Sequence, residues 1–196
     1  MKQIEITTRI NNNLNEIDKL LKKQGFKIIR NSVINDKYLA QNINLLNKNN
    51  ILDFLSKSVI LRFLNANGEE FRNVTYKIKT FKNNETISEQ KINLKVENLD
   101  TAEKLFNHLE FELLVNVKYN VVVYSNDKIE LAFQDVDGLG LLLEYENETD
   151  FDGVSNEIIL KTKRKMLEEV KSFGLKTTLD VDVKKAYELI LKRIGG

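Results

Sequence analysis

Polar and apolar residues alternate along several stretches of the chain, and this period of two predicts β-strands with one polar and one apolar face. At the start of the chain, Gln3, Glu5, Thr7 and Arg9 share one face, and isoleucine dominates the other. Two later strands flank a short turn and predict a hairpin. Strands are predicted over residues 3–10, 27–34, 59–64, 71–82, 91–96, 115–124, 129–134 and 141–146.

Apolar residues recur at helical spacing in other segments. The first of these patterns is followed by Gly25, which stands where a C-terminal cap belongs. Asp100 is predicted to cap another helix, with Glu103 three residues later. Leucine spacing predicts a helix over residues 42–57, although the asparagines at 47–50 are poor helix formers. Helices are predicted over residues 14–21, 42–57, from residue 100 onward, 154–173 and 182–194.

The composition fits one globular domain over residues 1–196, with 42% hydrophobic and 30% charged residues. The net charge is +1, so the chain lacks the overall positive field of a general nucleic-acid-binding protein. No stretch has the length of a signal peptide core or a membrane span, so we expect a cytoplasmic protein without a nucleic-acid or membrane partner. No linker, internal repeat or low-complexity segment divides the chain.

Cysteine is absent and His108 is the single histidine, which excludes disulfides, cysteine-based zinc sites and Ser-His or Cys-His nucleophiles. A metal ion in this protein would therefore need carboxylate ligands. His108 is interpreted as an ordinary helix residue. The glycines at 138 and 140 are interpreted as a turn rather than a phosphate loop, because no third glycine opens a helix. The basic run 161–165 is interpreted as a solvated helix face balanced by nearby glutamates.

Charged residues stand near the centres of the polar strand faces, and two interpretations remain open. For any one strand, the simpler is a solvated outer face of an antiparallel sheet. If the strands close into a barrel, the same faces converge on its interior, which then suits a polyphosphate held by Lys and Arg, with a divalent ion bridging it to carboxylates. These charged residues are Glu5, Arg9, Arg62, Lys77, Lys79, Lys91, Lys95, Lys118, Glu144 and Glu146.

The segment Phe133–Gly140, with Leu143–Glu146 after it, resembles the signature Leu-Asp-x-Val-x-Gly-Leu-Gly and x-Glu-x-Glu of the CYTH superfamily. This superfamily contains class IV adenylyl cyclases and thiamine triphosphatases and is also called the triphosphate tunnel metalloenzymes. Other motifs follow in the same order along nearly the whole chain. Glu5 matches the opening Glu-x-Glu-x-Lys strand, Leu61-Arg62 and Lys77 match the next basic strands, and Ala186–Ile190 resembles the C-terminal Ser-Tyr-x-x-Leu helix.

The resemblance implies an α+β fold in which eight antiparallel strands form a barrel, or tunnel, with flanking helices. It also implies a small-molecule triphosphate ligand and Mg or Mn as cofactor, in a monomer or homodimer. The carboxylates expected to hold the ion are Glu5, Glu144 and Glu146. The cations expected to bind phosphate are Arg9, Arg62, Lys77, Lys79, Lys91 and Lys118.

Departures from the motifs remove charge of both signs. Gln3 and Gln134 replace acids, and Thr7, Leu64 and Asn120 stand where the family has cations. Amides are weaker ligands than carboxylates for a hard cation, and lost cations weaken phosphate contacts. We therefore expect a phosphohydrolase or adenylyl cyclase relative with weak activity. The alternatives are a non-catalytic nucleotide- or polyphosphate-binding module on the same fold and a purely structural barrel.

Overall fold

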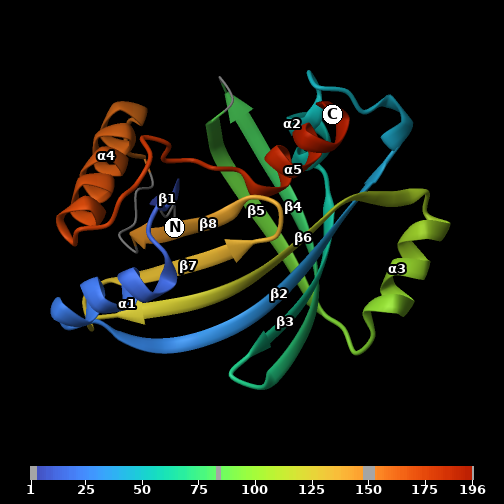
Figure 1. Cartoon of the computed structure of the whole chain (residues 1–196). Helices are drawn as coiled ribbons and strands as arrows, with labels where there is room; N and C mark the ends of the chain where they lie inside the picture. Colours follow the sequence, from blue (N-terminus) through green and yellow to red (C-terminus); the bar gives the residue numbers. More distant parts are fainter. Residues whose placement is uncertain (1–3, 83–84, 148–152, 196) are drawn as a thin grey trace. The chain divides into compact units, whose positions relative to one another are not determined.

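The computed structural model describes residues 4–82, 85–147 and 153–195, and it has the α+β class predicted from the sequence (Figure 1). Within these ranges, eight strands form one antiparallel sheet, accompanied by five α-helices and one 3-10 helix. The strands are β1 (Ile4–Arg9), β2 (Lys27–Gln41), β3 (Val59–Ala66), β4 (Glu69–Lys82), β5 (Glu85–Lys95), β6 (Phe111–Ser125), β7 (Glu130–Val136) and β8 (Gly140–Asn147). The helices are α1 (Leu14–Lys23), η1 (Ile43–Leu45), α2 (Ile51–Ser56), α3 (Leu99–His108), α4 (Asn156–Ser172) and α5 (Lys185–Gly195).

The strand order in the sheet is β1-β8-β7-β6-β2-β3-β4-β5. The predicted eight-stranded antiparallel sheet with flanking helices is therefore confirmed. Over the described ranges, β1 and β5 lie at the two ends of this order, so hydrogen bonds do not close the sheet. In the same part of the chain, no helix combines the length and the apolar character that crossing a membrane requires.

Local sequence determines where several helices begin. Asn13 and Glu16 form a capping box at the start of α1, in which the Asn13 side chain accepts from the Glu16 backbone N–H. The predicted cap at Asp100 is wrong, because Asn98 caps α3 and accepts from the Thr101 N–H at 2.9 Å. Asp100 instead lies in the first turn, where its charge complements the helix dipole.

The helix predicted over residues 42–57 is shortened to α2, with η1 before it. Asparagine side chains between these elements bind backbone groups that a helix would use. The Asn50 side chain accepts from the Asn47 N–H at 2.7 Å, and the Asn47 side chain accepts from the Asn49 N–H at 2.9 Å. These local hydrogen bonds compete with helix formation.

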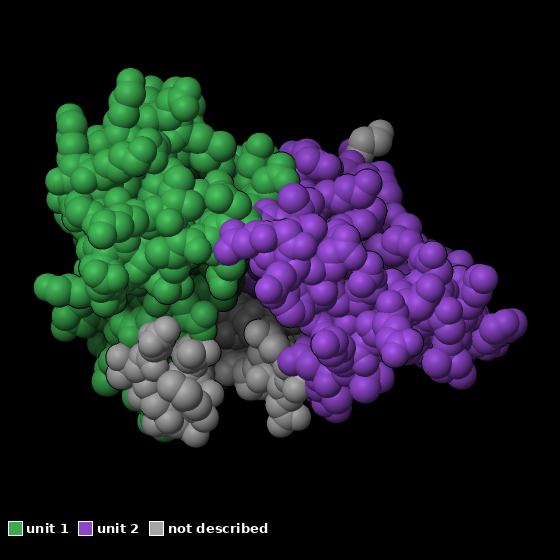
Figure 2. Space-filling view, turned by 90° about the horizontal axis from the view of Figure 1, so that it is seen from below, with its two compact units in different colours: residues 1–31, 120–136, 140–183 green, residues 32–119, 137–139, 184–196 purple. Residues whose placement is uncertain are grey.

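The chain divides into two compact units, coloured green and purple in Figure 2. Unit 1 contains residues 1–31, 120–136 and 140–183, and unit 2 contains residues 32–119, 137–139 and 184–196. Because each unit is built from separated segments, strands β2 and β6 contribute to both. The expectation of one domain over residues 1–196 stays a prediction.

In unit 1, one face of β1 is apolar and belongs to the hydrophobic core. Ile4 and Ile6 are buried there and pack with residues of α1 and α4, such as Leu21 and Val170. The alternate positions of β1 carry Glu5, Thr7 and Arg9 on the other face. This alternation leaves the polar face of β1 outside the core.

In unit 2 the strands also have one apolar face, which packs against α3, and one polar face. Leu39, Leu61 and Val74 form a buried apolar cluster, against which Phe106 of α3 packs. The opposite face of the same strands carries Asp36, Arg62 and Thr75 at alternate positions. Since α3 and its apolar cluster occupy one side, the polar groups of unit 2 gather on the other side of the sheet.

Candidate functional site

The three predicted metal ligands lie on the two paired strands β1 and β8 of unit 1. Glu5 stands directly opposite Glu146, and Glu144 stands opposite Thr7. Facing positions in an antiparallel pair project to the same side of the sheet, so the register brings these acids to one face. Arg9, half-buried, shares this face one step further along β1. Gln3 lies outside the described residues.

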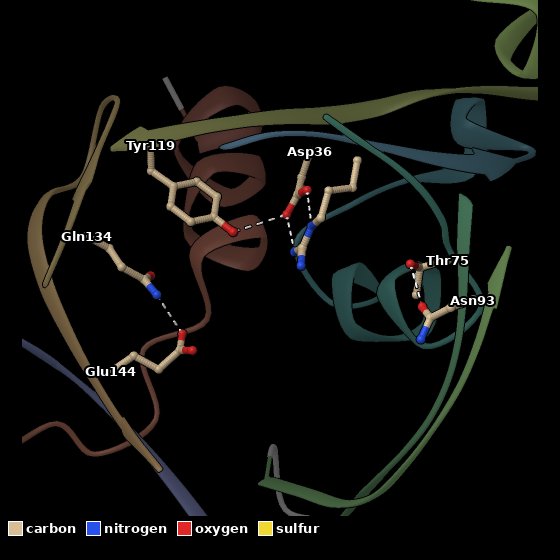
Figure 3. A network of polar contacts seen from close by, with 7 residues as sticks. Asp36, Thr75, Asn93, Tyr119, Gln134 and Glu144 are labelled. Atoms are coloured by element: carbon tan, nitrogen blue, oxygen red, sulfur yellow. Dashed lines mark hydrogen bonds and ion pairs between the residues drawn. The ribbon is translucent and has the colours of Figure 1, made fainter. Parts of the chain in front are cut away.

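Neutral hydrogen-bond donors contact two of these acids. The Gln134 amide nitrogen donates to Oε2 of Glu144 at 2.9 Å (Figure 3), and the Thr7 hydroxyl donates to Oε1 of Glu5 at 3.1 Å. Both donors are buried, with Gln134 4% and Thr7 6% exposed. These are two of the residues that depart from the motif, and each contacts one of the acids expected to hold the ion.

Whether a divalent ion fits these acids depends on how many of their oxygen atoms come together. Mg²⁺ and Ca²⁺ sites gather six or more oxygen ligands, usually with several carboxylates or waters. Among the residues that the structure describes, no three side chains of Asp, Glu, His or Cys come together as a metal-binding group. The donor set therefore does not form a preassembled metal centre, and the Mg or Mn site at Glu5, Glu144 and Glu146 stays a prediction.

Arg62 on β3 of unit 2 is held by a buried carboxylate. Its Nε and Nη2 atoms donate to Oδ1 and Oδ2 of Asp36 at 2.7 Å and 2.6 Å, and the Tyr119 hydroxyl donates to Oδ2 of Asp36 at 3.3 Å (Figure 3). The ammonium of Lys185 lies 4.7 Å from the centre of the Tyr119 ring, at cation–π distance. We call Asp36, Arg62 and Tyr119 the arginine cluster.

The electrostatics of the arginine cluster keep Arg62 charged. Burial by itself lowers the pKa of Arg62, but the hydrogen bonds and the negative charge of Asp36 outweigh that effect and raise the pKa above its ordinary value. Arg62 is therefore a permanent cation. Its fork-to-fork contact with a carboxylate also fixes the plane of the guanidinium group.

Asp36 is a candidate site residue that sequence reasoning missed. The predicted strand ended at residue 34, whereas β2 continues to Gln41. A signal was present, because Asp36 is the one acid between the apolar residues Ile34 and Tyr38 on the same face of the strand. In the register, Asp36 stands opposite Arg62.

The register of β3, β4 and β5 arranges further polar residues in rows beside Arg62. Arg62 stands opposite Asn73, which stands opposite Lys95, and in the next row the Thr75 hydroxyl donates to the Asn93 side chain at 2.8 Å (Figure 3). The row after that pairs the backbones of Lys77 and Lys91. The side chains of Lys77, Lys79 and Lys91 lie outside the described residues, so their predicted roles remain predictions.

Lys118 is not brought to the arginine cluster. Its neighbour Tyr119 reaches Asp36, and successive residues of a strand project to opposite faces. Lys118 therefore projects away from Arg62 and is exposed. The sequence pattern placed Lys118 on a polar face but contained no information about which face of β6 meets Asp36.

No protein-family model matches the chain. A curated protein of Methanocaldococcus jannaschii, named "Putative adenylate cyclase MJ0240", is 30% identical over 190 residues, which cover 95% of this chain and 97% of that protein.

Two solved structures show the same fold at low sequence identity. The PH1819 protein of Pyrococcus horikoshii is 18% identical, with a TM-score of 0.70, and the match covers 98% of this chain and 99% of that one. HpAC1 of Hippeastrum, an adenylyl cyclase candidate described as having a dominant triphosphatase activity, is 13% identical with a TM-score of 0.60, over 99% and 96% of the two chains. At these sequence identities, the likeness concerns the fold alone.

Proposed function

Because the chain belongs to the family of MJ0240 from Methanocaldococcus jannaschii, we propose that it binds a triphosphate-bearing small molecule on the polar face of its sheet and cleaves it slowly. We place it, as a divergent member, in the CYTH superfamily that its motifs resemble. The adenylate cyclase name of the relative and the triphosphatase activity described for HpAC1 both concern triphosphate compounds. They support a triphosphate rather than a monophosphate as the ligand.

The observation that carries this proposal is the placement of Arg62. It is a permanently charged group on the polar face, with a side chain 34% exposed, and its backbone row also contains Lys95. Guanidinium groups form charge-assisted hydrogen bonds with phosphate oxygens. The backbones of Lys77 and Lys91 pair two rows further along the same strands, which adds two lysine positions to this part of the sheet.

In the proposed reaction, the residues of this chain act by binding and charge neutralisation. Phosphoryl transfer depends mainly on positioning the phosphates and offsetting the charge that develops on them. Arg62 is suited to both tasks because its orientation is fixed. The described acids do not form a preassembled metal centre, so the proposed reaction assigns its roles to these protein groups alone.

A second candidate function is a binding module without turnover. The hydrogen bonds of Thr7 to Glu5 and of Gln134 to Glu144 favour it, because both acids already accept hydrogen bonds from neutral neighbours. Acids satisfied in this way have less to gain from a bound cation. The ligand would be the same, and the difference would be in product formation.

Two measurements separate these functions. Calorimetric titration with tripolyphosphate and with ATP, each with and without Mg or Mn, tests binding, and the melting temperature should rise with ligand because only the folded state binds. Release of phosphate, pyrophosphate or cyclic nucleotide tests turnover. Slow release supports the enzyme, binding without release supports the module, and neither heat nor a shift in melting temperature would leave only a structural role for the fold.

A further inference from the structure

We propose that Asp36 is a positioning residue for phosphate binding, which it serves by holding Arg62 in the orientation that receives the ligand. This inference rests on the proposed function, since it assigns a role within the same site. Asp36 belongs to none of the motifs through which the chain resembles the CYTH superfamily. The assignment comes from the geometry of the arginine cluster.

The contacts of Asp36 use one edge of the guanidinium group and leave the other. An arginine side chain carries five N–H donors in a rigid plane. Asp36 accepts one from Nε and one from Nη2, so the two hydrogens of Nη1 and the second hydrogen of Nη2 point away from this carboxylate. Two parallel contacts fix both the position and the plane of the group, which a single contact would not.

Burial indicates on which side the ligand binds. The Asp36 side chain is 2% exposed, whereas the Arg62 side chain is 34% exposed. The carboxylate therefore lies beneath the guanidinium group, and an anion arriving from solvent meets Arg62 first. In this arrangement Asp36 supports the arginine from below and does not occupy the place of the phosphate.

Tyr119 adds one further hydrogen bond that holds Asp36 in place. The Tyr119 hydroxyl donates to the same Asp36 oxygen that accepts from Nη2 of Arg62, and the Lys185 ammonium lies 4.7 Å from the centre of the Tyr119 ring. Asp36 thus accepts three hydrogen bonds in a buried position, which leaves it little freedom to turn. A fixed receptor loses less conformational entropy when the ligand binds, and this preorganisation increases affinity.

Asp36 could act on Arg62 in two ways, and the two have opposite effects on phosphate affinity. If its negative charge mainly offset that of Arg62, removing the charge would strengthen phosphate binding. If Asp36 mainly positions Arg62, removing its second acceptor oxygen would let the guanidinium turn and would weaken binding. Asp36→Asn distinguishes the two, because Asn keeps the shape and one acceptor but has neither the charge nor the second acceptor.

The experiment measures tripolyphosphate affinity by calorimetry in a double-mutant cycle. We expect Asp36→Asn to raise the Kd about tenfold in the wild-type background and to change it less than about twofold in an Arg62→Gln background. Glu70→Gln is the matched control, because Glu70 also pairs with an arginine, Arg72, on β4, at an exposed place. This control should leave the Kd unchanged.

The cycle also separates positioning from general damage to the fold. A purely structural role of Asp36 would weaken binding equally in both backgrounds, and tighter or unchanged binding by Asp36→Asn would contradict the proposal directly. If wild-type protein does not bind tripolyphosphate, the proposed function fails, and the role of Asp36 fails with it. If wild-type protein binds and Asp36→Asn binds equally well, only the positioning role is overturned.

A milder variant keeps the test decisive if Asp36→Asn does not fold. Tyr119→Phe removes one contact to Asp36 and keeps the ring beside Lys185. We expect it to raise the Kd about threefold, again only when Arg62 is present. A broadened or shifted Arg62 Nε–H resonance in this variant would show that the guanidinium has lost its fixed orientation, whereas an unchanged resonance and an unchanged Kd would contradict the proposal.

Discussion

The side-chain amide of Gln134 on β7 donates a hydrogen bond of 2.9 Å to the carboxylate of Glu144 on β8. The register pairs Ala132 rather than Gln134 with Glu144, so this contact is diagonal, between neighbouring positions on one face of the sheet. Gln134 is 4% exposed and Glu144 is half-buried, so the amide donor satisfies a carboxylate that is partly removed from water. The motif that this segment resembles has an acid at position 134, where the donor now stands.

Gln134→Glu replaces this donor by an acid of the same length and tests the contact. Two carboxylates at hydrogen-bonding distance repel each other, so we expect the free energy of unfolding at neutral pH to fall by about 1–3 kcal/mol. One of the two carboxyl groups should take up a proton, so the loss should shrink as the pH falls. Urea denaturation at pH 5 and pH 8 measures both effects.

The same variant reports on divalent ions. Adding Mn should restore more stability to Gln134→Glu than to the wild type, because paired acids bind a cation better than an acid and an amide do. Glu130→Gln, which removes a charge from the exposed first residue of β7, serves as the control for general charge effects. An equal response to Mn in all three proteins would show that position 134 does not govern metal affinity.

Restoring the motif residues should increase turnover. The combined variant Gln3→Glu, Thr7→Lys and Gln134→Asp returns two acids and a cation, and Thr7 stands opposite Glu144 in the register. Missing contacts in phosphoryl-transfer sites cost orders of magnitude, so an increase of about tenfold or more in Mn is expected. Phosphate and pyrophosphate release from tripolyphosphate and ATP measures it. A fully active wild type, or a folded variant without gain, would contradict this interpretation of the substitutions.

The alternation of polar and apolar residues predicted the faces of the strands because that pattern is local. Glu5 and Glu146 were each predicted on polar faces, and the structure places them opposite one another. Their pairing itself depends on the register between β1 and β8, which are far apart in sequence. A period of two indicates which residues share a face of one strand, but it does not indicate which strand lies alongside.

Asp36 and Lys118 illustrate this limit in opposite ways. The strand predicted over residues 27–34 ends before Asp36, whose importance arises from its contact with Arg62 across the strand pair. Lys118 lies on a polar face of its predicted strand, yet its neighbour Tyr119 is the residue that reaches Asp36. Tertiary packing decides which of the two faces of β6 meets the polar groups of unit 2.

Tyr124 in unit 1 predicts a loss of stability at high pH. Burial, followed by the charge and hydrogen bonding of Asp18, raises the pKa of Tyr124 from 10.0 to about 12. Because this pKa is higher in the folded state than in the unfolded state, its contribution to stability is complete below pH 10 and is lost as the pH rises toward 12. We expect the melting temperature to fall through this interval.

Tyr124→Phe should remove part of that decline. The variant has no phenol to ionise, so its stability should fall less between pH 10 and 12 than that of the wild type. At neutral pH it should lose about 0.5–1.5 kcal/mol, because the hydroxyl donates to Asp18 across 3.4 Å. Melting curves of both proteins across this range measure the difference, and parallel declines would indicate that other groups dominate the alkaline transition.

Arg62→Ala is predicted to lower both the free energy of unfolding and the affinity for triphosphate. Removing the guanidinium leaves Asp36 buried at 2% exposure without its ionic partner, which costs about 3–5 kcal/mol in comparable buried pairs. The triphosphate-induced rise in melting temperature should also shrink, because a phosphate contact is lost. A reduced shift in this variant alone therefore cannot be attributed to binding.

The double variant Arg62→Ala with Asp36→Asn resolves this ambiguity. Neutralising the orphaned carboxylate should recover part of the lost unfolding free energy, because Asn is less costly to bury than an unpaired charge. Triphosphate binding should remain weak, since no guanidinium is restored. Denaturant unfolding and calorimetric titration of the wild type, the two single variants and the double variant measure both quantities. If the double variant is no more stable than Arg62→Ala, Asp36 is not an unpaired buried charge in that variant, and its ion pair with Arg62 contributes less to the fold than its burial indicates.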